Sequence, residues 1–238
     1  MPDGARTEEI MEDFSSVIRE RRSIRKYLPD RVPDAVLREI LDEARWAPSC
    51  GNTQSTEVYV LSGYALERFK AALLERSRSE TPPLPDLEIP TPWPEPYQSR
   101  RKATMEARAA IVAAEEKRSG AVSQDLSLSP SASGSELFGA PHVLAIATNK
   151  CTSRSYACFD AGLLTQTIAL AAHARGLGTC ITAAVIGFPE ILRELIPGSE
   201  NEIFIIGVTL GYPDHEAIIN QVPRDRASLE ERVHFVEA

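Results

Sequence analysis

Two apolar segments in the second half of the chain limit its possible folds most strongly. Residues 142–148 are nearly all apolar, which is typical of a central strand covered on both faces. Residues 160–174 form a long, mostly apolar stretch that ends before Gly176 and predicts a helix buried on nearly every side. We therefore expect a layered core built around this strand and this helix.

Other patterns complete a single domain that combines helices and strands. Short runs of β-branched and aromatic residues predict strands at 57–61 and 202–210. Helices are expected where apolar residues recur every three or four positions, namely at 33–47, 64–76, 98–117 and 189–195, and after Asp13 with Phe14, Val17 and Ile18 on the buried side. At 238 residues the chain needs only one core. We expect a flexible polar tail at 1–12 and one domain at 13–238.

Composition changes sharply between residues 78 and 138. Prolines gather around Trp93 in residues 81–97, and residues 119–135 are rich in serine. Such segments lack the apolar surface that offsets the entropy lost on ordering. We expect residues 78–138 to form an insertion or lid, and residues 222–238 to leave the core as an extended arm.

Charge and composition exclude several classes of protein. The net charge of −8 disfavours a nucleic-acid partner, because such proteins concentrate basic residues on one face. No apolar run approaches the about 18 residues of a membrane span, and no signal or transit segment is readable, so a cytoplasmic protein without a membrane partner is expected. The four histidines are too scattered for a metal site. Neither a Rossmann fingerprint, a P-loop nor a Gly-x-Ser-x-Gly hydrolase motif occurs.

Two groups of arginines stand near opposite ends of the chain. Residues 21–27 read Arg-Arg-Ser-Ile-Arg-Lys-Tyr, and residues 223–226 read Pro-Arg-Asp-Arg. Guanidinium groups match the oxygens of a phosphate and a serine hydroxyl adds a neutral donor, so the two groups predict one shared phosphate-bearing ligand. Alternatively, residues 21–26 are a solvated run at the C-terminus of a helix, where positive charge is favoured. Spacing alone leaves both interpretations open.

A polar loop follows the helix expected at 33–47. Residues 47–54 read Ala-Pro-Ser-Cys-Gly-Asn-Thr-Gln and cannot continue that helix, because they are dense in Pro, Ser, Gly and Asn. The segment is either a plain turn, which composition alone favours, or a loop that binds a polar ligand.

Five segments, taken in order, resemble the nitroreductase family of FMN-dependent flavoenzymes. They are residues 21–27, 47–54, 176–180 (Gly-Leu-Gly-Thr-Cys), 210–213 (Leu-Gly-Tyr-Pro) and 223–226. The resemblance covers nearly the whole chain apart from the tail and the insertion. It implies an α+β, nitroreductase-like fold with a mixed central β-sheet flanked by helices. It also implies an intertwined homodimer with two FMN sites at the interface, in which the arm at 222–238 embraces the partner.

The resemblance further implies roles for individual residues. Arg25 is expected beside N1 and O2 of the flavin ring, where a positive charge stabilises the reduced state. The loop residues expected to meet the flavin from the second subunit are Pro48, Ser49, Asn52 and Gln54. The FMN phosphate and ribityl chain are assigned to Arg21, Arg22, Ser23, Arg224 and Arg226. The backbone that faces N5, the atom that accepts and delivers hydride, is assigned to Thr182, Ala183 and Ala184.

The sequence departs from the family pattern directly after the polar loop. Ser55 and Thr56 stand where the family usually has Pro and an aromatic residue after Gln54. The departure implies an altered wall of the substrate pocket, not a loss of FMN binding.

Three functions are compatible with these residues. The first is an FMN-dependent oxidoreductase that takes hydride from NADH or NADPH and passes it through N5 to a small aromatic acceptor, such as a nitroaromatic or a quinone, in a ping-pong cycle. The second is other flavin redox chemistry on the same scaffold: dehalogenation, desaturation or other oxidation, or flavin breakdown. The third is a flavin-binding protein without turnover. Bleaching of bound FMN by NADH or NADPH separates the first from the third.

Overall fold

A four-stranded sheet forms the centre of the molecule in the computed structural model, which describes residues 14–79, 81–88, 92–119 and 136–236. The strands are β1 (Thr56–Ser62), β2 (His142–Asn149), β3 (Gly178–Thr182) and β4 (Glu202–Gly211), and their order across the sheet is β1-β2-β4-β3. Residues 1–12, expected to form a tail, lie outside the described residues, as do residues 120–135 of the insertion.

The expectation of a mixed sheet is wrong for the described strands, because every neighbouring pair is antiparallel. The strand–helix–strand connection from β2 through α6 (Arg154–His173) does bring β3 back parallel to β2. However, β4 inserts between these two strands and pairs antiparallel with both. In the described chain, parallel pairing is limited to an isolated bridge between Ser23 and Thr179.

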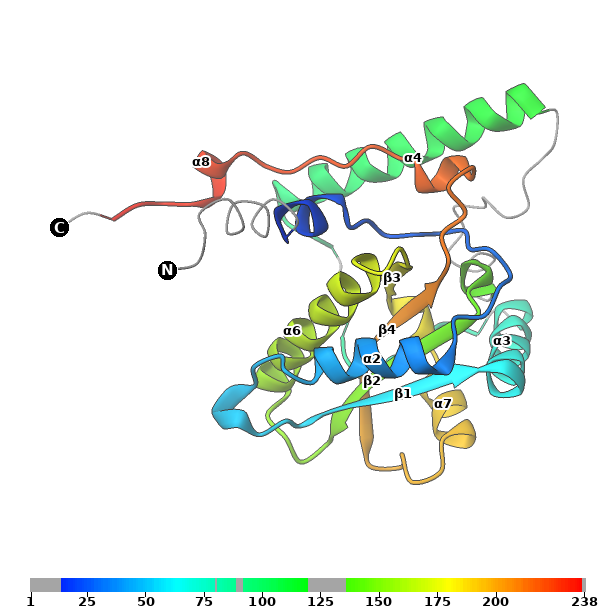
Figure 1. Ribbon diagram of the computed structural model, residues 1–238, viewed down its shortest axis with the longest axis vertical. Coiled ribbons are helices and arrows are strands. Elements are labelled where there is room, and N and C mark those ends of the chain that lie inside the picture. Colours follow the sequence, from blue (N-terminus) through cyan, green and yellow to red (C-terminus); the bar gives the residue numbers. More distant parts are fainter. Residues whose placement is uncertain (1–13, 80, 89–91, 120–135, 237–238) are drawn as a thin grey trace.

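Helices cover both faces of the sheet (Figure 1). On one face, α2 (Asp34–Ala44) and α6 pack with Leu144 and Ile146 of β2. On the other face, α3 (Gly63–Arg78) and α7 (Pro189–Leu195) pack with Val143, Ala145 and Ala147 of β2. Alternate residues of a strand point to opposite faces, and residues 142–148 are all buried. The prediction of a central strand covered on both sides is therefore confirmed.

Helix α6 begins before the predicted stretch 160–174, and within that stretch only Gly162, Gln166 and Ala174 are exposed. Ala161, Ile168 and Ala172 pack into the core, whereas Tyr156 is 60% exposed and Phe159 is 64% exposed. The helix predicted after Asp13 behaves similarly: residues 14–20 are helical, but Phe14 and Ile18 are exposed. The expected burial of Phe14 and Ile18 is therefore wrong, and neither residue joins a core cluster of the described chain.

The insertion, residues 78–138, contains a short segment fixed to the core and a long helix beside it. Asp86 accepts hydrogen bonds from the Arg193 guanidinium at 2.5 Å and from the Phe204 N–H at 3.0 Å. The long helix is α4 (Tyr97–Ser119), whose Val112 packs with Ile219 and Val222. The proline-rich part of the insertion is thus bound to α7 and β4 at Asp86.

The C-terminal segment runs along α4 and away from the sheet (Figure 1). It contains the short helix α8 (Leu229–Arg232), and Glu231 of α8 accepts a 2.7 Å hydrogen bond from Arg100 of α4. Phe235, near the end of the described chain, is 82% exposed. No helix among the described residues is both long enough and apolar enough to cross a membrane.

Candidate functional site

The N-terminal basic segment, residues 21–27, lies along the free edge of β3. Ser23 forms a parallel bridge with Thr179, and the Ile24 N–H donates to the Thr179 carbonyl oxygen at 2.9 Å. Gly178 permits this approach, because a Cβ at that position would lie 2.5 Å from Ile24 Cγ1. Ile24 and Tyr27 are buried. The segment is therefore bound to the sheet edge and is not a solvated extension of the first helix.

Asn220 fixes the basic segment from the side of the C-terminal residues. Its Oδ1 accepts from the Arg25 N–H at 2.7 Å, and its Nδ2 donates to the carbonyl oxygens of Lys26 and Asp214, both at 2.8 Å. Its own carbonyl oxygen accepts from Arg22 Nη1 at 2.8 Å. Asn220 is buried, and its side-chain amide bonds both to the N-terminal basic segment and to Asp214. It therefore determines how the two ends of the chain meet.

A hollow of about 170 Å³ lies where these ends meet, and arginines dominate its lining. Its lining residues that carry a charged or hydroxyl group are Arg21, Arg22, Ser23, Arg25, Thr104, Arg108, Arg224, Asp225 and Arg226. We call it the arginine hollow. Within the described residues, none of its six guanidinium groups forms an ion pair with a carboxylate.

Electrostatics in the arginine hollow favour an anionic ligand. Burial lowers the pKa of Arg21, and the positive charge of Arg226 lowers it further. Burial also lowers the pKa of Arg224, with Arg22, Arg21 and Arg226 adding to the effect. Guanidinium groups that repel one another in a partly dehydrated hollow are stabilised by a shared anion. The arrangement therefore suits a phosphate.

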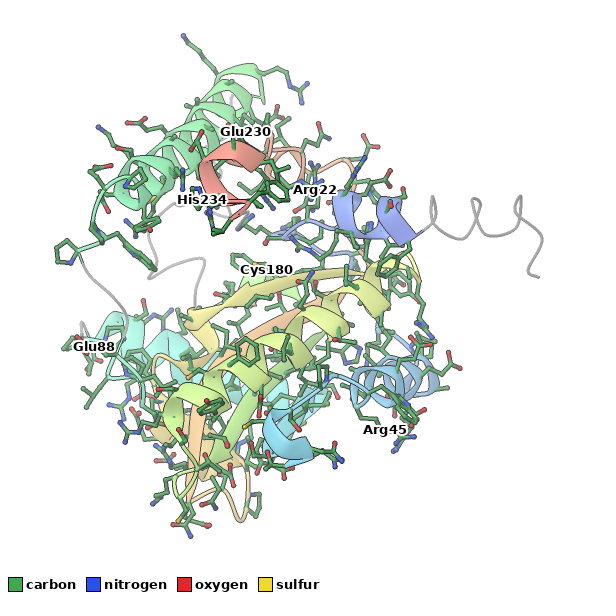
Figure 2. All side chains as sticks on the ribbon, turned by 90° about the vertical axis from the view of Figure 1, so that its left-hand side faces the viewer. Arg22, Arg45, Glu88, Cys180, Glu230 and His234 are labelled. Atoms are coloured by element: carbon green, nitrogen blue, oxygen red, sulfur yellow. The ribbon has the colours of Figure 1, made fainter. Side chains whose placement is uncertain are left out.

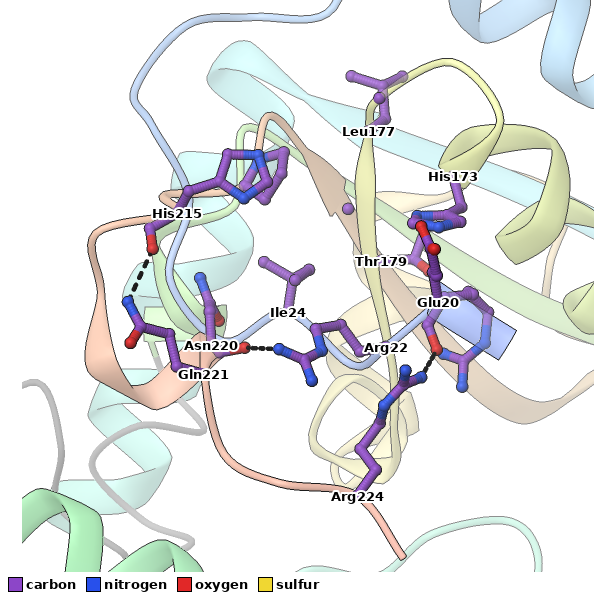
Figure 3. A pocket seen from close by; sticks show the side chains of 14 residues that line it. Glu20, Arg22, Ile24, His173, Leu177, Thr179, His215, Asn220, Gln221 and Arg224 are labelled. Carbon is purple, nitrogen blue, oxygen red and sulfur yellow. Dashed lines mark hydrogen bonds between the residues drawn. The ribbon is translucent and has the colours of Figure 1, made fainter. Parts of the chain in front are cut away.

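Arg224 has a second task in the described structure. Its guanidinium donates to the carbonyl oxygen of Arg19 at 2.6 Å and to that of Arg21. These carbonyls lie at the end of the first helix, where cations are favoured. Arg22 and Arg224 also line a larger pocket of about 380 Å³ with His173 and His215 (Figure 3). Arg224 thus ties the C-terminal segment to the N-terminal basic segment.

The edge of β3 leads from the arginine hollow to the predicted N5-facing residues. From Thr179 to Thr182 the strand advances about 10 Å. At its end Thr182 Oγ1 accepts from the Ala184 N–H at 3.2 Å and begins a 3-10 turn, Ala183–Ile186. Gly207 makes room for this turn, because a Cβ there would lie 2.2 Å from Val185 Cβ. Thr182, Ala183 and Ala184 line no part of the arginine hollow.

Cys180 lies in β3, between the arginine hollow and Thr182. Its thiol is buried, and burial raises its pKa even though Arg25, Ser23, Arg108 and Arg21 favour the thiolate. Figure 2 shows Cys180 on the side of the core that faces α4 and the C-terminal segment. A ligand extending from the arginine hollow to Thr182 would pass over this residue.

The polar loop, residues 47–54, has a strained backbone held in place by α6. Asn52 and Gln54 have φ angles of 57° and 49°, a region that residues other than glycine adopt only where the surroundings enforce it. Both carboxylate oxygens of the buried Asp160 lie 3.1 Å from the Cys50 nitrogen, which donates to them. The Gln54 N–H donates to Ser49 Oγ at 2.9 Å. A prearranged, exposed loop of this kind is suited to binding.

Within one chain, the polar loop does not meet the arginine hollow. Asp160 holds the loop, whereas His173 shares a pocket with Arg21 and Arg22. Asp160 and His173 lie about 20 Å apart, because an α-helix rises about 1.5 Å per residue. Figure 2 likewise shows Arg45, just before the loop, far from Arg22. The predicted phosphate residues and the predicted loop residues therefore lie at opposite ends of α6, and Thr182, Ala183 and Ala184 form a third group at the end of β3.

Sequence reasoning missed three residues of this region. Asn220 and Arg108 gave no local signal, because their partners become neighbours only in the folded chain. Asp160 did carry a signal, since it is a carboxylate within a mostly apolar helix pattern. Such a residue is rarely buried unless it has a partner.

Comparisons with known proteins identify the family of this chain. The model of the nitroreductase family matches residues 18–212, so the chain belongs to the nitroreductase family. The chain is 31% identical to a 4-nitrobenzoate reductase of Nocardioides sp. (strain LMS-CY), over 95% of this chain and 91% of that protein. It is also 31% identical to a chloronitrobenzene nitroreductase of Comamonas testosteroni, over 94% of this chain and 96% of that protein.

A solved structure extends the comparison to three dimensions. The FMN-dependent nitroreductase NfnB from Mycobacterium smegmatis, in complex with NADPH, superimposes with a TM-score of 0.82 at 28% identity, covering 96% of this chain and 100% of that chain. The α+β, nitroreductase-like fold expected from the sequence is thereby confirmed.

The substitution Asp160→Asn is expected to loosen the polar loop and lower the free energy of unfolding by about 1 kcal/mol, the difference between a hydrogen bond to a charged and to a neutral acceptor. Hydrogen exchange at residues 48–54, together with denaturant unfolding, measures both effects. Asp42→Asn is the matched control, because Asp42 pairs with Arg45 on the surface, where such pairs contribute little. Equal effects of the two substitutions would remove Asp160 from this role.

Proposed function

We propose that this protein is an FMN-dependent oxidoreductase that uses NADH or NADPH to reduce nitroaromatic or quinone-like acceptors. The observation that carries the proposal is the arginine hollow, in which residues from both ends of the chain converge beside the edge of β3. The names of its relatives, among them nitroreductases acting on 4-nitrobenzoate and chloronitrobenzene, support the same substrate class.

The chemistry of the hollow fits the phosphate end of FMN. Arg21, Arg22 and Arg226 supply guanidinium groups, and Ser23 supplies a neutral donor; together they match a phosphate monoester. Arg224 lines the same hollow and holds the two ends of the chain together. The ribityl chain would then follow the edge of β3 toward Thr182, Ala183 and Ala184, whose backbone would face N5.

Arg25 has the chemical role in this assignment. Bound FMN supplies the capacity to accept hydride from a nicotinamide and to pass electrons to an acceptor. Arg25 would place a fixed positive charge beside N1 and O2, where reduction adds negative charge. Its Nη1 donates to the Ser23 carbonyl oxygen at 3.1 Å, and its N–H is held by Asn220. The Nη1 bond orients the guanidinium, and the bond to Asn220 fixes the backbone of Arg25, before any ligand arrives.

A homodimer would complete the site. The polar loop is about 20 Å from the arginine hollow along α6, so Pro48, Ser49, Asn52 and Gln54 would meet the flavin bound by a second subunit. The exposed Tyr156 and Phe159 of α6, with the exposed Phe14 of the first helix, offer apolar surface for such an interface. In this arrangement the arm at 222–238 embraces the partner, and the insertion at 78–138 lies beside the flavin as a lid.

A second function is favoured by the residues after the polar loop. Ser55 and Thr56 lead into β1, and the Ser55 carbonyl oxygen accepts from Thr148 Oγ1 at 2.9 Å. They replace the Pro and aromatic residue usual in the family, so the pocket wall differs. Other flavin redox chemistry, such as dehalogenation, desaturation or flavin breakdown, is therefore the alternative.

Steady-state kinetics with purified protein test the proposed function. NADPH or NADH oxidation should require added or bound FMN and a nitroaromatic such as 4-nitrobenzoate, and double-reciprocal plots should be parallel, as a ping-pong cycle requires. If the protein binds FMN tightly but oxidises neither NADPH nor NADH with any nitroaromatic or quinone as acceptor, the alternative chemistry is favoured.

The substitution Arg25→Gln is expected to lower the two-electron potential of bound FMN while leaving FMN occupancy high, because glutamine keeps a donor but removes the charge. Reduction by NADPH should slow more than reoxidation by a fixed acceptor. Anaerobic redox titration measures the potential, and Lys26→Gln is the neighbouring control. An unchanged potential at full occupancy would place Arg25 away from the ring.

A further inference from the structure

We propose that Arg108, on α4 of the insertion, is a further ligand of the cofactor phosphate, so that FMN binding holds α4 against the core. The inference rests on the proposed function, because it assigns FMN to the arginine hollow. It gives the insertion a binding role that neither its composition nor the arrangement of the sheet implies.

The position of Arg108 supports this role. Thr104 and Arg108 lie one turn apart on the same face of α4, and both line the arginine hollow with Arg21, Ser23 and Arg25. The Nε of Arg108 is buried and has no hydrogen-bond partner in the described structure. Buried polar groups are almost always paired, so an unpaired guanidinium nitrogen in a cationic hollow indicates a place for an anion.

Charge around Arg108 points the same way. Its pKa is lowered mainly by burial and next by the positive charge of Arg25. A half-buried guanidinium in a hollow lined by five other arginines is unfavourable unless an anion shares the hollow. Asp225, the acidic residue that lines the hollow, already accepts the Arg226 N–H at 2.8 Å. A phosphate dianion would remove the repulsion that otherwise opposes the docking of α4.

Among the described residues, few other contacts hold α4 in place, so the anion can control its docking. Val112 packs with Ile219 and Val222, and Arg100 pairs with Glu231 on the surface. Surface pairs of this kind contribute little. Because a ligand that binds the docked state stabilises it, and the docked state in turn binds the ligand more tightly, FMN and α4 docking should be linked reciprocally.

The phosphate of FMN is the anion that these contacts favour. Arg108 shares its hollow with Arg21, Ser23 and Arg226, the residues assigned to that phosphate on independent grounds. NADPH carries a phosphate monoester of the same chemistry, so the experiment must distinguish the two sources.

The test compares Arg108→Gln with the parent protein in the full-length apoprotein, using FMN and riboflavin as ligands. Fluorescence titration should show FMN affinity reduced about tenfold to a hundredfold, as expected for one charged hydrogen bond, with riboflavin affinity changed less than about twofold. Arg101→Gln is the matched control, because Arg101 is exposed on the same helix. It should leave both affinities unchanged.

Hydrogen exchange of α4 provides a readout that does not depend on activity. In the parent protein, FMN should protect residues 97–119 far more than riboflavin does, and Arg108→Gln should abolish the difference. Equal protection by both ligands, or an unchanged FMN affinity in Arg108→Gln, would overturn the inference. If Arg108→Gln changes only the ratio of the KM values for NADPH and NADH and leaves FMN affinity unchanged, the inference is also overturned, because Arg108 then belongs to the nicotinamide site.

Failure of the proposed function looks different from failure of this inference. A parent protein that binds neither FMN nor riboflavin would contradict the proposed function itself. If the parent protein binds FMN tightly and Arg108→Gln gives the same FMN and riboflavin affinities as the parent, only the role of Arg108 is contradicted.

Discussion

Deletion of residues 226–238 should abolish both dimer formation and FMN binding. The arm runs along α4 and away from the sheet, and the apolar side chains of Phe235 and Val236 are 82% and 93% exposed in the single chain. Exposed apolar side chains on an extended segment have little reason to be ordered unless a partner covers them. The deletion also removes Arg226 from the arginine hollow. Multi-angle light scattering and the flavin absorbance per protein chain measure the two losses.

Two full-length variants separate the causes. Arg226→Ala should remain a dimer and bind FMN more weakly, because only the phosphate contact is lost. The double substitution Phe235→Ser and Val236→Ser should weaken the dimer while Arg226 is intact. A truncated protein that is folded by circular dichroism, monomeric and loaded with flavin would show that the intertwined arrangement is wrong.

Arg21→Ala should weaken FMN binding about tenfold to a hundredfold, since a hydrogen bond to a charged group contributes about 1.5–3 kcal/mol. The pKa of Arg21 is lowered by burial and by Arg226, so its charge lacks a counter-ion that a phosphate would supply. Riboflavin lacks the phosphate, and its affinity should hardly change. The absorption spectrum of bound FMN should also keep its shape, because Arg21 is assigned to the phosphate and not to the ring.

The control for this substitution is Arg19→Ala. Arg19 is exposed, and only its backbone carbonyl takes part in the hydrogen bond from Arg224. Its removal should leave both affinities near those of the parent. Equal losses of FMN and riboflavin affinity in Arg21→Ala would move Arg21 away from the phosphate.

Sequence patterns predicted those parts of the fold that depend on local periodicity. Residues 142–148 are apolar throughout and form the strand buried on both faces, and the helix predicted at 189–195 coincides with α7. The beginning of α6 at Arg154 was not predicted, because its first turns are mostly exposed and carry no buried apolar pattern. The sheet direction was also missed, since it depends on β4 entering between two strands that precede it in sequence.

The candidate site divides in the same way. Arg21, Arg22, Ser23, Arg25, Arg224 and Arg226 were predictable as a group from residue type and order, and all six line one hollow. Arg108 was not predictable, because its helix reaches the hollow only through the docking of the insertion. The separation of the polar loop from the hollow follows from the length of α6, and a linear motif carries no such information.

Anaerobic mixing of the FMN-loaded protein with NADPH or NADH, followed by mixing with 4-nitrobenzoate, tests the central claim most directly. The account predicts that the nicotinamide bleaches the flavin absorbance and that the nitroaromatic restores it, with one nicotinamide oxidised per flavin reduced. A flavin that dithionite reduces but neither nicotinamide bleaches would contradict the claim, as would a bleached flavin that no nitroaromatic or quinone reoxidises.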